Sequence, residues 1–377
     1  MSTKVAFVGT GDVFLKYYLP EAIEQDIIDI TAICDIELDR AEKVAEFVGG
    51  AEAYGSYTEM LERSDAQLVV IVTPPTTHYQ LALEGLEAGK HVYVEKPFCR
   101  HLEQADHLIA TAEANAVHLM AAPTVMLDPP NMMMREMIAE GAIGSVAFAT
   151  APAFQMGGAI SGYFDRFSKQ LEFSGIDVLS RPEEKTDASW YYQKGGGPVY
   201  DLAVYSITQM TGLLGPVERV LALSGTVDPT RTLMQGTEEV RQIEVTEDDN
   251  TSILLDFGES RFVYVNAAWH GVASRAQGME IIGSRGTLTV SGGGDLVTRT
   301  REATVHLYSN SAKEWQDYPV EDELWWIPTG LTHLARCISE GRQPDISIEH
   351  ARHVVEVMEK AYVAARSGEA QEITTTF

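Results

Sequence analysis

Short apolar runs alternate with helix-like segments over the first third of the chain. An uninterrupted apolar run predicts a buried strand, and apolar residues every three or four positions predict a helix. Strands that are apolar almost throughout, separated by helices, predict a parallel sheet covered on both faces. The predicted strands span 4–9, 28–35, 51–54, 68–73, 91–94 and 118–121. The predicted helices span 19–25, 38–48, 56–63, 78–88 and 102–114.

The pattern changes at about residue 122. Asp128-Pro129-Pro130 predicts the start of a helix that runs to Gly141, since proline suits a first helical turn. Strand patterns with few helices between them then predict a larger, mostly antiparallel sheet. They span 146–151, 217–225, 253–257, 261–268, 277–282 and 286–290, and two helices, 329–340 and 348–367, follow them.

Composition narrows the class of protein. A chain of 377 residues is long enough for two folded domains, and a hydrophobic content of 45% is enough to form their cores. The 28 basic and 55 acidic side chains give a net charge of −27, which argues against nucleic acid or anionic membranes as partners. Three dispersed cysteines predict a cytoplasmic protein without disulfides or a bound metal. The absence of a long apolar run predicts no membrane span, and a strand at the very start leaves no room for a signal peptide.

Two glycines, Gly9 and Gly11, follow the first predicted strand, and Asp35 ends the second. Such glycines let a pyrophosphate approach the backbone at a helix N-terminus, and such an acid accepts hydrogen bonds from the adenosine ribose. Phe14 stands where a third small residue is usual, so the helix must shift or sit further from the sheet. The order of these elements favours dinucleotide binding over an ordinary strand–helix turn. The predicted contacts are Gly9, Thr10, Gly11, Asp12, Val13 and Asp35.

The residues after Asp35 predict which dinucleotide binds. A carboxylate there accepts hydrogen bonds from the ribose 2′-hydroxyl and repels a 2′-phosphate. Ile36 and Glu37 follow, so no cation stands immediately beyond the acid, and the nearest is Arg40. The sequence therefore predicts NAD as the cofactor. NADP is the less favoured alternative, because Arg40 could reach back.

The run 93–98, Tyr-Val-Glu-Lys-Pro-Phe, places Lys96 at the end of a strand beside the nucleotide crevice. Desolvation lowers the pKa of a lysine and allows it to exchange protons near neutral pH. Glu-Lys-Pro alone is a common surface tripeptide. Its position after a complete nucleotide-binding half-domain favours proton transfer.

Two further groups contain candidate site residues. Thr73 ends the 68–73 strand, and Pro74, Pro75 and His78 follow it, at the edge where ligands bind. A helix start is the alternative for the two prolines, and a satisfied histidine in the first helical turn explains His78 equally well. Asp201 and Tyr205 follow Gly195-Gly196-Gly197-Pro198 and share one helical face, although a capping acid and a core tyrosine are the alternative. The long aromatic loop 156–194 is expected to shape a pocket through Tyr163, Phe164, Arg166, Trp190 and Tyr191.

These motifs, in this order, resemble the glucose–fructose oxidoreductase / inositol dehydrogenase / rhizopine-catabolism (Gfo/Idh/MocA) family over nearly the whole chain, including 279–287. The resemblance implies that Lys96 assists proton transfer and holds the substrate and the nicotinamide ribose. It also implies that Pro97 is cis, that Glu95 lies near the nicotinamide and that Asp201 binds substrate hydroxyls. Many members have histidine where this chain has Tyr205, so either Tyr205 or Lys96 is the principal acid/base.

The resulting prediction is an α/β protein with a doubly wound Rossmann domain at 1–123 and a C-terminal α+β domain at 124–377. The second domain would bind the substrate and join subunits into a homodimer or homotetramer through its open sheet. The expected activity is NAD(P)-dependent oxidation or reduction of a secondary alcohol on a sugar, a cyclitol or a sugar derivative. The predicted substrate contacts are Lys96, Tyr163, Arg166, Trp190, Asp201 and Tyr205. The alternatives are an NAD-dependent glycosidase that acts through a transient ketone, and a non-catalytic sensor of sugars or nucleotides.

Overall fold

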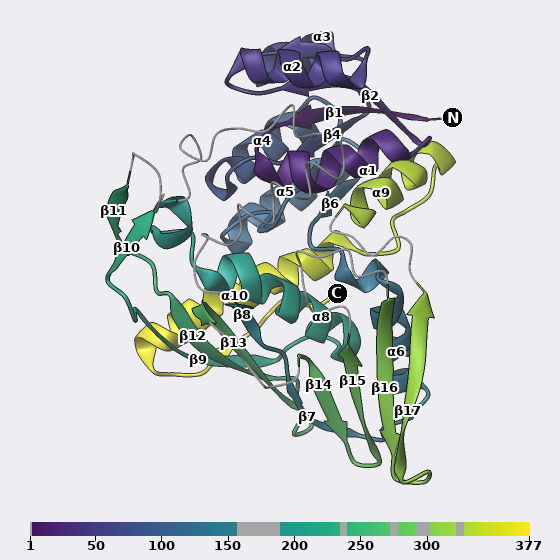
Figure 1. The fold of residues 1–377 in the computed structure, drawn as a ribbon, viewed down its shortest axis with the longest axis vertical. Helices are drawn as coiled ribbons and strands as arrows, with labels where there is room; N and C mark the ends of the chain where they lie inside the picture. The colour runs from purple at the N-terminus through teal and green to yellow at the C-terminus, as the bar shows by residue number, and fades with distance from the viewer. Residues whose placement is uncertain (1, 157–188, 234–239, 272–277, 292–301, 322–327) are drawn as a thin grey trace. The chain divides into compact units, whose positions relative to one another are not determined.

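A computed structural model describes residues 2–156, 189–233, 240–271, 278–291, 302–321 and 328–377 (Figure 1). The described chain forms two compact units. One contains the residues up to 124 together with 328–352, and the other contains 125–156, 189–321 and 353–377. The domain boundary predicted after residue 123 stays a prediction.

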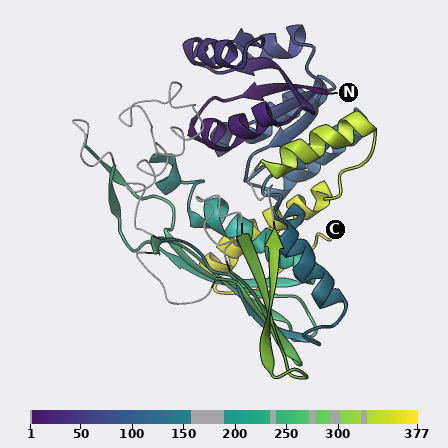
Figure 2. The ribbon, with the colours of Figure 1, turned by 45° about the vertical axis from the view of Figure 1, so that its right-hand side comes forward.

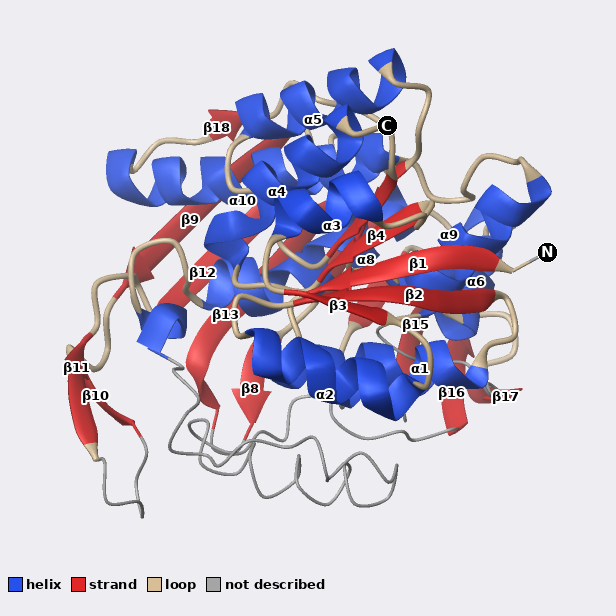
Figure 3. Cartoon of the chain, turned by 90° about the horizontal axis from the view of Figure 1, so that it is seen from above, coloured by secondary structure: helices blue, strands red, loops and turns tan. Residues whose placement is uncertain are grey.

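The first unit is built on a parallel sheet with strand order β3-β2-β1-β4-β5-β6. The strands are β1 (Thr3–Val8), β2 (Ile28–Cys34), β3 (Glu52–Tyr54), β4 (Leu68–Ile71), β5 (His91–Val94) and β6 (Leu119–Ala121). Helices α2 (Leu38–Val48), α3 (Tyr57–Arg63), α4 (Pro75–Glu87) and α5 (Leu102–Ala114) connect them and lie on both sides of the sheet (Figure 3). This confirms the predicted doubly wound sheet. The strand order reverses between β1 and β4, where such sheets bind ligands.

The helix after β1 begins with a π-helical turn, Phe14–Tyr18, and continues as α1 (Leu19–Glu24). Phe14 is fully buried and packs edge-on against Phe7 of β1, with ring centroids 5.1 Å apart. A π-turn accommodates one more residue per turn than an α-helix does. The turn is therefore the local shift of the helix that a large residue at position 14 requires.

A helix from late in the chain completes the first unit. Helix α9 (Thr329–Glu340) contacts β1 and β6, and Figures 1 and 2 show it beside the other elements of this unit. Thr3 Oγ1 donates a hydrogen bond to the Ala335 carbonyl (2.7 Å), and Thr332 Oγ1 donates to Glu21 Oε1 (2.8 Å). The first unit thus includes a segment that follows all but the last strand of the second sheet in the sequence.

The second unit is built on a mixed, mostly antiparallel sheet of order β17-β16-β15-β14-β7-β13-β12-β9-β18, with β8 beside β13. Its strands include β7 (Val146–Thr150), β8 (Ala153–Met156), β9 (Arg219–Gly225), β12 (Asn250–Asp256), β13 (Phe262–Gly271), β14 (Glu280–Gly283) and β15 (Gly286–Ser291). The remaining strands are β16 (Glu302–Ser309), β17 (Glu314–Glu321) and β18 (Gln371–Glu372). Alternate residues of β12 and β13, such as Ile253 and Val263, are fully buried on one face. The predicted large sheet is confirmed.

Among the described residues, three longer helices belong to the second unit or extend into it. They are α6 (Pro129–Ala139), α8 (Val204–Leu214) and α10 (Ile348–Ser367). Helix α6 contacts β16, and α8 contacts β13. A separate ribbon is formed by β10 (Thr230–Leu233) and β11 (Arg241–Glu244). No helix among the described residues is long and apolar enough to cross a bilayer.

Candidate functional site

The turn after β1 has the backbone that a dinucleotide site needs. Gly9 has φ +90°, and a Cβ at this position would lie 2.4 Å from the Val72 carbonyl oxygen, so no other residue fits without strain. No described atom lies within 4 Å of the place where a Cβ on Gly11 would be. The Gly11 backbone is therefore open to a ligand at the start of the helix, where phosphates bind. Gly9 and Gly11 thus leave the backbone accessible to a pyrophosphate, and the contacts predicted from Gly9 to Val13 stay a prediction.

Asp35 lies just past the end of β2 and is tied to this turn. Its Oδ2 accepts hydrogen bonds from the Thr10 amide (2.8 Å) and hydroxyl (2.7 Å), and its Oδ1 accepts from the Glu37 amide (3.0 Å). Burial opposes ionisation of Asp35, but these hydrogen bonds and the charge of Arg40 outweigh it and lower the pKa. Asp35 is therefore an ionised carboxylate beside the glycine turn, which suits contact with a ribose.

Arg40 does reach back to this acid. Its Nη1 lies 3.3 Å from Asp35 Oδ2, and its Nη2 donates to the Thr10 carbonyl. The cation is held in a partly buried position near the end of β2. The sequence left this contact open, and it places a phosphate-binding group next to the predicted ribose acid.

The segment 95–97, here named the Lys96 turn, leaves the carboxyl end of β5. The Lys96–Pro97 peptide bond is cis, which confirms the implication of the family resemblance. Glu95 is buried, its Oε2 accepts a hydrogen bond from the Lys96 amide (2.8 Å), and its Oε1 accepts from the Tyr18 hydroxyl (2.7 Å). Tyr18 ends the π-turn after β1 and was not predicted from the sequence.

His78 holds the other end of the same turn. Its imidazole is fully buried, with Nδ1 2.8 Å from the Pro97 carbonyl and Nε2 2.8 Å from the Thr73 carbonyl. Burial lowers the pKa of His78, while hydrogen bonding to the two carbonyls opposes that shift. Both ring nitrogens therefore contact the backbone. Pro75 begins α4 after Pro74, so this predicted group lies at the carboxyl end of β4.

In the second unit, the three glycines form a tight loop before a helix. The Gly195 amide donates to Glu247 Oε2 (2.7 Å), and the Gly197 amide donates to the Tyr191 carbonyl (2.8 Å). A Cβ on Gly196 would lie 2.2 Å from the Trp190 carbonyl oxygen. The loop therefore requires glycine and packs against the segment that contains Trp190.

A π-turn, Val199–Ala203, follows this loop and leads into α8. Asp201 lies in the π-turn and Tyr205 in the first turn of α8, and both are partly exposed. Irregular π-turns occur often at functional sites. Because Asp201 and Tyr205 are partly exposed, a ligand can reach their side chains.

Aromatic residues gather beside the glycine loop. Trp190 stacks on Tyr191 with ring centroids 3.7 Å apart, and Tyr191 meets the Trp269 ring edge-on at 5.6 Å. Burial is the largest cause that raises the pKa of the Tyr192 phenol. The charge of Arg231 opposes this rise, and the charges of Asp249 and Asp201 add to it. Of the predicted aromatic loop, Trp190 and Tyr191 are thus placed here, whereas Tyr163, Phe164 and Arg166 lie outside the described residues.

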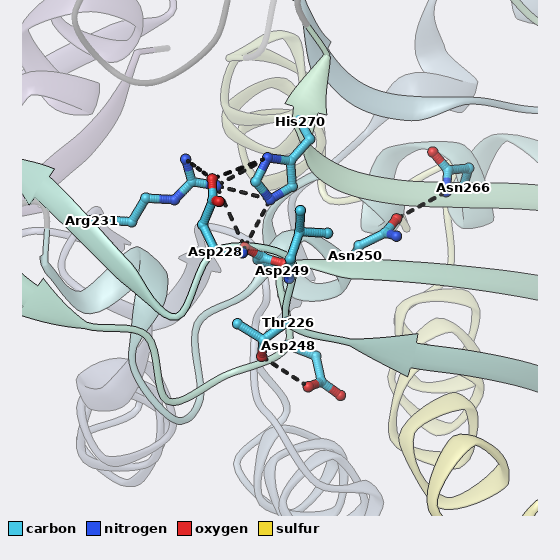
Figure 4. A network of polar contacts seen from close by, with 9 residues as sticks. Thr226, Asp228, Arg231, Asp248, Asp249, Asn250, Asn266 and His270 are labelled. Atoms are coloured by element: carbon cyan, nitrogen blue, oxygen red, sulfur yellow. Dashed lines mark hydrogen bonds and ion pairs between the residues drawn. The ribbon is translucent and has the colours of Figure 1, made fainter.

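A buried polar network supports this aromatic group (Figure 4). Asp249 has no exposed surface, and its Oδ2 lies 2.8 Å from His270 Nε2 and 3.4 Å from Arg231 Nη2. The Arg231 guanidinium also lies over the Tyr192 ring, 5.6 Å from its centroid. Each charge is paired, so the network suits a structural role. Within the described chain, no group of His, Cys, Asp and Glu could hold a metal ion.

Comparison with known proteins identifies both parts of the chain. The model of the oxidoreductase family with an NAD-binding Rossmann fold matches residues 3–122, and that of the GFO/IDH/MocA C-terminal domain matches 132–289. A dTDP-3,4-didehydro-2,6-dideoxy-alpha-D-glucose 3-reductase of Actinomadura kijaniata is 27% identical over 56% of each chain. A glycosyl hydrolase family 109 protein of a Shewanella strain is 35% identical over 32% of this chain and 29% of its own. The chain thus spans less than two thirds of these relatives.

A solved structure supports the fold over the full length. The NAD binding oxidoreductase of Klebsiella pneumoniae has a TM-score of 0.78 and 20% sequence identity, and the match covers 100% of both chains. At this identity the likeness shows the fold alone. The two family matches, in the order predicted from the motifs, decide the assignment. The chain belongs to the Gfo/Idh/MocA family of oxidoreductases.

Proposed function

We propose that this protein is an NAD-dependent oxidoreductase that interconverts a secondary alcohol and a ketone on a sugar, a cyclitol or a sugar derivative. The observation that carries the proposal is the place of Lys96. It lies on a turn at the carboxyl end of β5, in a sheet whose first turn fits a pyrophosphate. Buried side chains hold both Glu95 and the Pro97 carbonyl. A lysine on such a turn is suited to exchange the proton of a substrate hydroxyl.

Each residue then has a defined role. Gly9, Gly11 and Asp35 would hold the cofactor, and its nicotinamide would supply the acceptor for the hydride of the carbinol carbon. Lys96 takes the hydroxyl proton, and Asp201 accepts hydrogen bonds from neighbouring substrate hydroxyls. Tyr205 donates or accepts a hydrogen bond at the reacting oxygen and shares the proton transfer. Trp190 offers an aromatic face to the apolar side of a sugar ring, and Tyr163 and Arg166 remain proposed substrate contacts.

The substrate class is supported by a related enzyme. The relative from Actinomadura is named as a reductase of a nucleotide-linked keto-sugar. The test is a screen of sugars, cyclitols and sugar derivatives with NAD, following the absorbance of reduced nicotinamide. We expect turnover with at least one secondary alcohol of this class. A purified, folded protein that binds NAD but oxidises or reduces no member of the panel contradicts the proposal.

We expect NAD to be preferred over NADP in kcat/KM, because the ionised Asp35 repels a 2′-phosphate. Asp35→Ser should narrow the gap by about tenfold, since Arg40 would lose its carboxylate partner and become available to the phosphate. Steady-state kinetics with both cofactors measure this change. Asp39→Ser is the matched control, because it removes a nearby exposed acid from the first turn of α2. A wild-type preference for NADP contradicts the proposed role of Asp35.

A second candidate function is redox-neutral cleavage of a glycoside. It is favoured by the 35% identity to a glycosyl hydrolase family 109 protein over 131 residues. A transient ketone would acidify the neighbouring carbon, loss of its proton would expel the aglycone, water would add to the resulting unsaturated ketone, and the same reduced cofactor would return its hydride. The amount of free reduced nicotinamide per substrate consumed separates the two candidates. A stoichiometric amount supports the dehydrogenase, and none, with release of the aglycone, supports the glycosidase.

The large sheet is the proposed contact between subunits in a homodimer or homotetramer. Its uncovered face exposes apolar side chains on five neighbouring strands, namely Phe148, Leu221, Leu223, Leu254, Phe262, Tyr264 and Ile282. In register, Phe148 lies between Ile282 and Phe262, and Leu254 lies between Leu221 and Tyr264. A continuous apolar patch of this kind marks an interaction surface.

We propose the cytoplasm as the location of the protein. The thiols of Cys34, Cys99 and Cys337 are free and buried, which suits a reducing compartment.

Leu254→Glu should convert the oligomer to monomers, because it places a charge within the apolar patch, between Leu221 and Tyr264. Light scattering after size-exclusion chromatography measures the mass. Phe47→Glu is the matched control, since Phe47 is an apolar side chain of similar exposure on α2 of the first unit. A wild-type protein that is monomeric at micromolar concentration, or an unchanged mass for Leu254→Glu, contradicts this contact.

A further inference from the structure

Two buried side chains from different elements hold the Lys96 turn at its two ends. The Tyr18 hydroxyl, from the helical segment after β1, donates to Glu95 Oε1 (2.7 Å). The His78 imidazole, from α4 after β4, contacts the Pro97 carbonyl through Nδ1 (2.8 Å). Both side chains have no exposed surface, so neither is placed to touch a substrate directly.

The Tyr18 contact reaches the lysine through one carboxylate. Glu95 uses Oε1 for Tyr18 and Oε2 for the amide of Lys96 (2.8 Å), so the carboxylate connects the phenol to the backbone of the lysine. Burial, and then the charge of Glu95, raise the pKa of Tyr18 well above its usual value, which keeps the hydroxyl protonated as a donor. The Tyr18 ring also meets the Tyr93 ring edge-on at 6.0 Å, and this contact fixes its direction.

The His78 contact connects the ends of two neighbouring strands. Nε2 lies 2.8 Å from the Thr73 carbonyl after β4, and Nδ1 lies 2.8 Å from the Pro97 carbonyl after β5. Strands β4 and β5 are hydrogen-bonded neighbours in the sheet. The imidazole therefore braces the loops that leave both strands. Burial favours the neutral imidazole, which has one N–H, and the tautomer with its proton on Nδ1 donates to the Pro97 carbonyl. Loss of this hydrogen bond from a buried carbonyl is costly, so the contact resists movement of the turn.

We propose that Tyr18 and His78 are positioning residues that fix the place and direction of Lys96 from the two ends of its turn. The role of Lys96 rests on the proposed function, but its position does not. In this role His78 binds the backbone of the turn, through the Pro97 carbonyl, instead of the cofactor. It also gives Tyr18, which no sequence motif marked, a defined part in the site.

The first test measures the exposure and direction of the lysine itself. A small amine-acylating reagent labels Lys96 and Lys90, and mass spectrometry gives the ratio of the two rates in one protein. Lys90 is an internal reference, because its ammonium donates to the Ser64 and Ala66 carbonyls, away from the Lys96 turn. In Tyr18→Phe we expect the ratio to change about fivefold, the factor for one lost hydrogen bond. An unchanged ratio overturns the role of Tyr18.

Two substitutions of His78 separate its two contacts. Asparagine can place an amide donor where Nδ1 lies, and glutamine can place one where Nε2 lies. His78→Asn should therefore keep the Pro97 contact and leave the labelling ratio near that of the wild type, whereas His78→Gln should change it about fivefold. Equal ratios for the two variants, or the reverse order, overturn the role of His78. Tyr57→Phe is the control for loss of a hydrogen-bonded phenol, since the partly buried Tyr57 donates to the Leu81 carbonyl (2.8 Å) in the same unit.

Kinetics provide a second readout once a substrate is known. Tyr18→Phe and His78→Gln should each lower kcat about fivefold to tenfold while the Kd for NAD stays within twofold, and Tyr57→Phe should leave both unchanged. A loss of NAD affinity equal to the loss of kcat overturns the positioning role. If the wild type oxidises no alcohol, the proposed function fails. The labelling ratios still decide whether Tyr18 and His78 position Lys96.

Discussion

Replacing Lys96 with alanine is expected to lower turnover by about 10²–10⁴-fold, because the substitution removes the group that exchanges the substrate proton. The backbone of the turn should persist, since Glu95 accepts from the Lys96 amide and His78 contacts the Pro97 carbonyl. Neither contact needs the lysine side chain. Affinity for NAD should therefore change far less than turnover.

The measurement combines steady-state kinetics with calorimetric titration of NAD. Lys90→Ala is the matched control, because it removes a lysine at the opposite end of β5. The control should retain turnover. If Lys96→Ala turns over its best substrate at the wild-type rate, Lys96 has no part in proton transfer.

Tyr205→Phe is expected to lower turnover by about 10²-fold with little change in melting temperature. Tyr205 lies in the first turn of α8, directly after the π-turn, and is partly exposed. The substitution keeps the ring and removes the hydroxyl alone. A group that acts on the substrate oxygen should lose rate, while the packing of the helix stays intact.

Tyr200→Phe is the control within the same π-turn. Tyr200 is buried and stacks on Tyr362 at 5.6 Å, so the loss of its hydroxyl should leave turnover near the wild-type value. Kinetics and thermal melting are measured on both variants. A normal rate for Tyr205→Phe returns Tyr205 to a packing role and leaves Lys96 as the principal acid/base. Large losses in both Lys96→Ala and Tyr205→Phe indicate that the two share the proton transfer.

Much of the fold could be predicted because its periodicity is local. The ranges 38–48, 102–114, 329–340 and 348–367 are helices with the bounds that the apolar spacing predicts. The short apolar strands of the first unit are also found within one or two residues of the prediction. Their side chains are buried on both faces of a parallel sheet, which leaves an unbroken apolar signal.

Other elements carry a weaker local signal. Strand β17 lies at the edge of its sheet, contains Pro319 and exposes half of Trp315, so it lacks the pattern of a central strand. The β10–β11 ribbon mixes polar and apolar residues. The packing of α9 on β1 depends on contacts across more than 300 residues, such as Thr3 to Ala335. No window of sequence contains that information.

In the candidate site, too, some residues could be predicted from local sequence and others depend on contacts between distant parts of the chain. Gly9, Asp35 and Lys96 stand at strand ends in a recognisable order, so their positions in the sheet could be predicted. The hydrogen bond from Tyr18 to Glu95 could not, because it joins residues 77 positions apart. The buried pairing of Asp249 with His270 and Arg231 likewise joins a loop residue to strands β13 and β10. Such contacts follow from the fold and leave no motif.

The most direct measurement of the central claim follows a deuterium label from the substrate to the cofactor. The alcohol identified by the screen is prepared with deuterium on the reacting carbinol carbon and is incubated with the enzyme and NAD. Mass spectrometry should find one deuterium in the reduced nicotinamide, in an amount equal to the ketone formed. Substrate consumption without deuterium in free reduced nicotinamide would contradict net oxidation of the alcohol by hydride transfer.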